Sequence, residues 1–148
     1  RAPRKGEVDG VNYFFLTREE FDRRVANGEF VEWAEVHGNC YGTLVSEVES
    51  KLASGSSLIL EIDVQGALQV KERFPEAVLI FIKPPSLEVL RDRLVGRGTE
   101  TPETIELRMA NAADELALAD RYDDVVVNDD LDRATDELVR VLDMHERI

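Results

Sequence analysis

The sequence predicts an α/β fold with a mostly parallel sheet flanked by helices, together with a smaller mixed unit at its N-terminal end. Short apolar runs that end in polar residues are typical of strands buried on both faces. Helical patterns separate these runs, and such alternation of strands and helices favours a parallel sheet. Before about residue 45, the strand-like segment at residues 29–36 alternates in polarity, which is typical of an antiparallel unit.

The N-terminal unit, before about residue 45, is expected to contain one helix and three short strands, and a second helix is expected to follow it. Thr17 is predicted to begin the first helix, because Glu20 completes a capping box, and Gly28 is a typical residue to follow a helix. The second helix is also expected to be capped. The strands are expected at residues 13–16, 29–36 and, after a turn, within 39–43, and the second helix at residues 46–55.

The rest of the chain alternates between strand and helix patterns. Strands are expected at residues 57–63, 77–82 and 124–128, and helices at residues 65–74, 86–96, 102–120 and 131–147. Thr101 followed by Pro102 is a typical helix start. In this architecture ligands bind beyond the carboxyl ends of the strands, where Asp63, Pro84 and Asn128 are expected.

Composition restricts the classes of partner. The 148 residues suffice for one domain with a hydrophobic core, and no apolar run is long enough to span a membrane. Acidic residues outnumber basic ones by 31 to 18, and the net charge of −13 opposes binding to nucleic acid or anionic membranes. The single cysteine, Cys40, excludes an internal disulfide and suits a reducing cytoplasm. His37 and His145 lie far apart, which argues against a structural zinc site.

The first residues include candidates for binding an anion. Arg1 and Arg4 flank a proline, and each guanidinium is able to hold a phosphate through two parallel hydrogen bonds. Tyr13 and Tyr41 are able to donate phenolic hydrogen bonds to the same group. The alternative interpretation is solvated surface charge for the arginines, and core packing with a hydrated hydroxyl for the tyrosines.

Glu32 and Thr43 form a candidate site for recognising guanine. A carboxylate matches the two adjacent donors of guanine, N1–H and the N2 amino group, and a hydroxyl matches O6. Adenine carries an acceptor at N1, so the same carboxylate would reject it. The alternative is an exposed acid on a half-buried strand.

Two further acids and three arginines are candidates for chemistry on phosphates. Glu61 and Asp63 occupy alternate positions at the end of a predicted buried strand, where a metal-bound water, an amine or an arginine would compensate their charge; the alternative is a solvated turn. Arg93 and Arg97 share a helix face, and with Arg108 they border a glycine-containing loop. Mobile arginines suit phosphoryl transfer, although surface charge paired with nearby acids is the simpler interpretation.

Several segments together resemble one family. The segments RAPRKGEVDGVNY, GEFVEWAEVHGNCYGT, LEIDVQGALQV, PPSLEVLRDRLVGRGTET and VVVNDDLDRA occur in this order. Along essentially its whole length the chain resembles guanylate kinases, which transfer a phosphate from ATP to GMP. The resemblance implies a P-loop kinase-type sheet with a GMP-binding subdomain over residues 1–46, an α/β core over 47–95 and 109–148, and a lid over 96–108.

The resemblance also implies roles for individual residues. GMP would be bound through Arg1, Arg4, Tyr13, Glu32, Tyr41, Thr43 and Asp63. Catalysis would involve Arg93, Arg97, Arg108 and Asp63, and ATP would contact Arg93, Arg97 and Asn128. Mg²⁺ would accompany ATP, with Glu61 holding it through water. The partners implied are GMP and ATP, without nucleic acid or membrane, in a cytoplasmic monomer or homodimer.

Two other interpretations remain. One is a module that is not an enzyme, and the other is a kinase that selects a different base. A non-catalytic guanylate kinase-like module would bind phosphorylated peptides, but such a module does not need guanine-recognising residues together with lid arginines. Another nucleoside monophosphate kinase would differ in the base that it selects.

One expected family motif is missing from these residues. The family has a strand and a phosphate-binding loop of the form G-x-x-x-x-G-K-S/T just before the segment that contains Arg1 and Arg4. Nothing in the 148 residues matches this loop. We therefore expect the sequence to start after that segment. Without its strand and loop, residues 1–148 alone are predicted to fold poorly and to transfer phosphate too slowly to be useful. Normal turnover of ATP and GMP by this polypeptide in a coupled assay would contradict the expectation.

Overall fold

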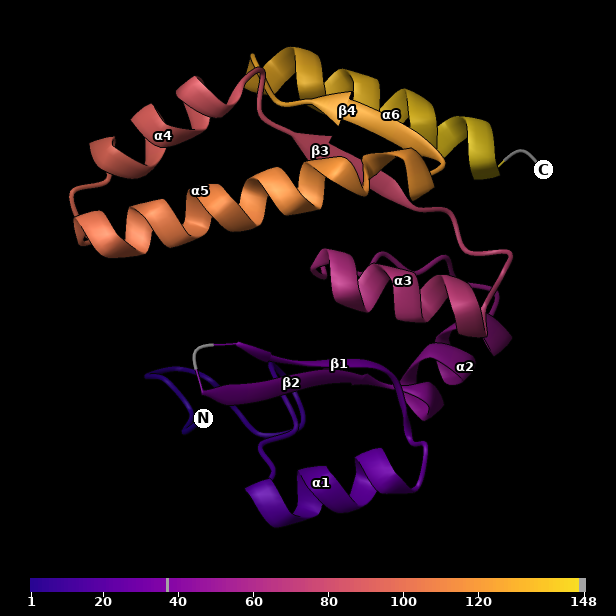
Figure 1. Cartoon of the computed structure of the whole chain (residues 1–148). Helices are drawn as coiled ribbons and strands as arrows, with labels where there is room; N and C mark the ends of the chain where they lie inside the picture. Colours follow the sequence, from indigo (N-terminus) through magenta and orange to yellow (C-terminus); the bar gives the residue numbers. More distant parts are fainter. Residues whose placement is uncertain (37, 147–148) are drawn as a thin grey trace. The chain divides into compact units, whose positions relative to one another are not determined.

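The computed structural model describes residues 1–36 and 38–146 (Figure 1). The chain divides into two compact units, Arg1–Pro75 and Glu76–Ile148. The functional subdivision expected at residue 46 stays a prediction. None of the helices in the described ranges is long and apolar enough to cross a membrane. His37, and residue 147 at the expected end of the last helix, lie outside the described residues.

The first unit is built on an antiparallel hairpin that packs against helices. Strand β1 pairs with β2 so that Glu32 lies opposite Thr43 and Ala34 lies opposite Tyr41. Figure 1 shows the hairpin between α1 and α3, and both helices contact β1. The elements are α1 (Arg18–Ala26), β1 (Phe30–Val36), β2 (Asn39–Leu44), α2 (Val45–Ala53) and α3 (Val64–Arg73).

Helix α3 is attached to the backbone of β1 through one side chain. The amide of Gln69 accepts a hydrogen bond from the backbone N of Trp33 at 3.1 Å and donates one to the Trp33 carbonyl at 3.2 Å. On α1, Phe21 is buried and its ring centroid lies 4.6 Å from that of Phe30. These contacts place α3 beside the middle of β1, where Glu32 lies.

The start of the first helix confirms its capping prediction, and the start of the second differs from it. Thr17 Oγ1 accepts from the backbone N of Glu20 at 3.1 Å, and Glu20 Oε2 accepts from the backbone N of Thr17 at 3.3 Å. Helix α2 instead begins at Val45, directly after β2, and its N-cap Leu44 makes no side-chain capping bond. The backbone N of Val45 donates to the carbonyl of Glu29, so tertiary structure sets this start.

Two of the predicted strands are wrong for the residues described. Tyr13 makes only an isolated bridge with Asp9, and residues 14–16 form no strand. Residues 57–63 also form no strand, and Ile59 in that segment is 70% exposed. An apolar run reports a tendency to be buried, whereas a strand exists only where a neighbouring strand pairs with its backbone.

The second unit contains the parallel strand pair that the sequence predicts. Strands β3 and β4 are parallel, with Phe81 opposite Val125 and Ile82 opposite Val126. Figure 1 shows α6 alongside β4, and these two elements are in contact. The elements are β3 (Ile80–Lys83), α4 (Leu87–Gly96), α5 (Pro102–Ala117), a 3₁₀ turn (Ala119–Arg121), β4 (Asp124–Val127) and α6 (Leu131–Glu146).

In this unit the predicted cap at Thr101 is confirmed and Ser86 caps α4, but the strands are less buried than expected. Ser86 Oγ accepts from the backbone N of Val89, and Thr101 Oγ1 accepts from that of Thr104. Val126 is buried, with 1% exposure, whereas Ile82 is 55% exposed. The expectation of burial on both faces is therefore wrong here, because in the described unit helices cover this two-stranded sheet only partly.

The burial of Val126 predicts a local difference in stability. Val126→Ala removes two methyl groups from a packed position and is expected to lower the free energy of unfolding by about 2 kcal/mol. Val125→Ala removes the same atoms from the adjacent residue, which is 39% exposed, and should cost clearly less. Urea denaturation of both variants checks this, and equal destabilisation would contradict the packing described.

Candidate nucleotide site

The hairpin of the first unit brings together the two residues predicted to recognise guanine. Thr43 Oγ1 donates a hydrogen bond to Glu32 Oε1 at 2.7 Å. Glu32 is only 5% exposed, so the alternative of an exposed acid on a strand does not describe it. The antiparallel register produces this pair by placing the two residues opposite each other.

The N-terminus of α3 borders the same carboxylate. Asp63 is the N-cap of α3, and its Oδ1 accepts from the backbone N of Gly66 at 2.9 Å. A Cβ atom on residue 66 would lie 2.7 Å from Glu32 Oε2 and 3.1 Å from Asp63 Oδ1. Glycine at this position therefore permits a buried carboxylate to lie directly against the first turn of the helix.

The surroundings of Glu32 favour its protonated form. Burial raises the pKa of the Glu32 carboxyl above its ordinary value, and the nearby negative charge of Asp63 acts in the same direction. The hydrogen bond from Thr43 opposes this shift. A ligand that presents hydrogen-bond donors to Glu32 would compensate the buried negative charge.

Three of the four residues predicted to hold a phosphate lie together. The guanidinium carbon of Arg1 is 5.2 Å from the ring centre of Tyr13, and the Tyr13 ring meets that of Tyr41 edge-on at 6.3 Å. All three line one small pocket. Arg4 is exposed and is not among the residues that line this pocket.

Sequence reasoning missed an acid that joins both arginines. Glu7 forms a two-pronged ion pair with Arg1, from Nη1 to Oε1 at 2.8 Å and from Nη2 to Oε2 at 3.0 Å. Its Oε1 also accepts from the backbone N of Arg4 at 2.7 Å. The only signal in the sequence is an acid three residues after Arg4, which is too common a pattern to single out.

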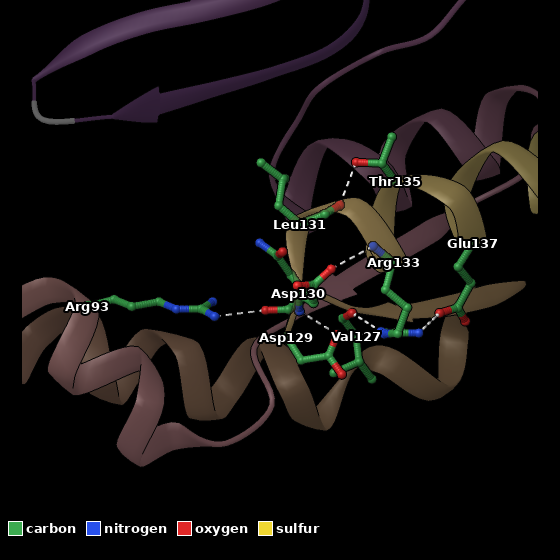
Figure 2. Close-up of polar contacts among 9 residues, drawn as sticks. Arg93, Val127, Asp129, Asp130, Leu131, Arg133, Thr135 and Glu137 are labelled. Carbon is green, nitrogen blue, oxygen red and sulfur yellow. Dashed lines mark hydrogen bonds and ion pairs between the residues drawn. The ribbon is translucent and has the colours of Figure 1, made fainter.

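In the second unit, Arg133 makes several bonds to the turn after β4, as Figure 2 shows. Arg133 donates from Nε to Asp129 at 2.7 Å, from Nη1 to Glu137 at 2.7 Å and from Nη2 to the Val127 carbonyl at 2.6 Å. The pKa of Asp129 is lowered by the hydrogen bond from the backbone N of Asp130 and then by Arg133. These bonds shape the turn at the carboxyl end of β4, where a ligand is expected.

The three arginines of the predicted lid region have different surroundings. Arg93 extends from α4 toward this turn, and its Nη2 donates to the Asn128 carbonyl at 3.0 Å (Figure 2). Arg108 pairs with Glu100 at 3.0 Å, and the Glu100 side chain is only 11% exposed. Arg97 follows the last turn of α4 and is exposed.

The predicted metal residue lies on an exposed segment. Glu61 and Asp63 are both exposed, and Asp63 is engaged in capping α3. Within residues 1–36 and 38–146, no three His, Cys, Asp or Glu side chains form a group able to hold a metal ion. A single exposed carboxylate fits a magnesium ion held largely by water and by nucleotide phosphates.

Comparison with known proteins identifies the family to which this chain belongs. A family model described as guanylate kinase matches residues 1–145. The chain is 54% identical to the guanylate kinase of Halalkalibacterium halodurans and 56% identical to that of Gloeobacter violaceus, in each case over 96% of this chain and about 70% of the relative. A crystal structure of guanylate kinase from Anaplasma phagocytophilum superposes with a TM-score of 0.75 at 41% identity, covering 97% of this chain and 70% of the other. With a match this continuous, the chain belongs to the guanylate kinase family.

Proposed function

We propose that this protein, where the family's phosphate-binding loop accompanies residues 1–148, transfers the γ-phosphate of ATP to GMP, yielding ADP and GDP. The observation that carries the proposal is the buried Glu32 carboxylate bonded to Thr43, in a chain whose relatives are guanylate kinases. Burying a carboxylate is costly unless it meets donors, and guanine supplies two of them side by side. A module that binds only phosphorylated peptides does not require such a group.

Guanine recognition would use an exchange of hydrogen bonds. The Thr43 hydroxyl has a single proton, which in this structure is donated to Glu32. When guanine places N1–H and its amino group against Glu32, those donors satisfy the carboxylate. The Thr43 hydroxyl is then free to rotate and donate to O6. Asp63, at the adjacent N-terminus of α3, is the further residue that we place near the base.

The phosphate of GMP would be held by the arginines and tyrosines of the first unit. Arg1 lies with Tyr13 and Tyr41 around one pocket, and Arg4 would add a second guanidinium from the same turn. Guanidinium groups and phenolic hydroxyls present donors that match phosphate oxygens. This local cluster would act against the protein's overall charge of −13.

Transfer would proceed by in-line attack of a GMP phosphate oxygen on the γ-phosphorus of ATP. Guanidiniums from the lid would stabilise charge on the phosphoryl oxygens, and closure would exclude water. Bound Mg²⁺ would neutralise phosphate charge, with Glu61 holding one of its waters. In this proposal the ATP-side residues are Arg93, Arg97, Arg108 and Asn128, and Asp63 serves both the base and the reaction.

The cellular setting is proposed on general grounds. A chain with one cysteine, Cys40, and strong negative charge suits the cytoplasm, without a nucleic-acid or membrane partner. We propose that it acts there as a monomer or homodimer on GMP and ATP.

Glu32→Gln tests the proposed base recognition. The variant keeps the size of the side chain but replaces a carboxylate oxygen with an amino group that opposes the donors of guanine. We expect GMP binding to weaken by about 1–3 kcal/mol. Calorimetric titration with GMP measures this. The matched control is Glu35→Gln on the same strand, whose side chain is 52% exposed, and it should bind GMP normally. Unchanged affinity in Glu32→Gln would remove Glu32 as the base-recognising residue.

Glu32→Gln is also expected to change the free energy of unfolding, and the change depends on pH. Because the folded-state pKa of Glu32 is raised, its contribution to stability is fully present below the unfolded-state pKa and is lost as pH rises through the folded-state value. Glu32→Gln removes this titration. Its stability relative to the parent protein should therefore increase as pH rises above about 4, the ordinary pKa of a glutamic acid side chain. Urea denaturation at increasing pH checks the sign, and a relative stability that falls with pH would contradict it.

A further inference from the structure

Glu7 binds both the side chain of Arg1 and the backbone of Arg4. Its carboxylate receives three hydrogen bonds, two from the Arg1 guanidinium and one from the backbone N of Arg4, all between 2.7 and 3.0 Å. Its own backbone N donates to the Arg4 carbonyl at 3.0 Å. One residue therefore determines both the shape of the turn and the direction of the Arg1 side chain.

The ion pair leaves Arg1 oriented toward the pocket. The side chains of Arg1 and Glu7 are 16% and 19% exposed, which is low for charged residues of a terminal segment. With Glu7 on one edge, the Arg1 guanidinium lies over the Tyr13 ring, and Tyr41 is close enough to contribute to the raised pKa of Arg1. Arg1 Nη1 also donates to the carbonyl of Ala2. Of the five guanidinium N–H groups of Arg1, the bonds to Glu7 and Ala2 use three.

Charge alone gives the opposite expectation for this acid. Arg1 holds the pKa of Glu7 at about 2, with help from the backbone of Arg4, so Glu7 is ionised at neutral pH. A negative charge beside a phosphate site repels phosphate, and simple electrostatics predicts that removing it strengthens binding. If Glu7 instead acts by orienting Arg1, removing Glu7 should weaken phosphate binding, because an unrestrained arginine must lose side-chain entropy when it binds.

We propose that Glu7 is a positioning residue that holds Arg1 and the Arg4 turn ready for the 5′-phosphate of GMP. This inference rests on the proposed function, because it assumes that the pocket of Arg1, Tyr13 and Tyr41 receives that phosphate. The benefit of orientation exceeds the repulsion because Glu7 binds one edge of the guanidinium and leaves other donors for the ligand. Its effect is confined to the phosphate, since Glu32 and Thr43 recognise the base.

The test compares GMP with guanosine, which lacks the phosphate, by calorimetry on the full chain. Glu7→Gln keeps an acceptor for the backbone N of Arg4 but loses the charged pair with Arg1. We expect its affinity for GMP to fall about tenfold, with unchanged affinity for guanosine. The matched control is Asp9→Asn, which removes the same charge from a carboxylate bonded to the Phe15 backbone. It should retain the preference for GMP.

The possible results separate the explanations. If Glu7→Gln binds GMP as tightly as the parent protein, or more tightly, the positioning role is overturned while the proposed function stands. If affinity for guanosine falls as much as affinity for GMP, Glu7 is merely structural and the inference is again overturned. If the parent protein shows no preference for GMP over guanosine, the proposed phosphate site itself fails, and the inference fails with it.

Discussion

The burial of one carboxylate constrains the first unit of this protein. Glu32 is 5% exposed and lies between its partner Thr43 and the first turn of α3. Such a group is tolerated only where donors surround it: the hairpin register brings Thr43 to it, and the glycine at position 66 leaves room for it beside α3. The cost appears as a raised pKa for Glu32. A ligand with matching hydrogen-bond donors would compensate the cost of burying this carboxylate.

A second constraint concerns negative ligands in a protein of net charge −13. In such a protein an anion is attracted only by nearby basic side chains. Two of the arginines, Arg1 and Arg133, are each paired with acids. Glu7 orients Arg1 in the first unit, and acids around Arg133 shape the turn after β4 in the second. In both places acids reduce the net positive charge but give guanidiniums a defined geometry. Geometry decides short-range recognition of phosphate, because two-pronged hydrogen bonds require an aligned donor plane.

Sequence reasoning was most accurate for helix starts. The capping box of Thr17 and the cap at Thr101 appear as predicted, since each is a bond between residues three apart. Strands were less predictable. The runs at residues 57–63 and 77–82 were both predicted to be strands, yet only the second contributes a strand among the residues described. Hydropathy is a property of the segment itself, whereas pairing depends on another segment.

The sequence by itself determined the caps of α1 and α5, the α/β alternation and the motif order that resembles guanylate kinases, because these depend on neighbouring residues and on composition. Only the tertiary structure decided that Glu32 is buried against α3, that α2 begins without a side-chain cap, and that Glu7 binds Arg1. Each of these depends on a partner brought close by folding. The free energy of burying or pairing a charge is set by that partner and its distance, and neither is encoded within a single short segment.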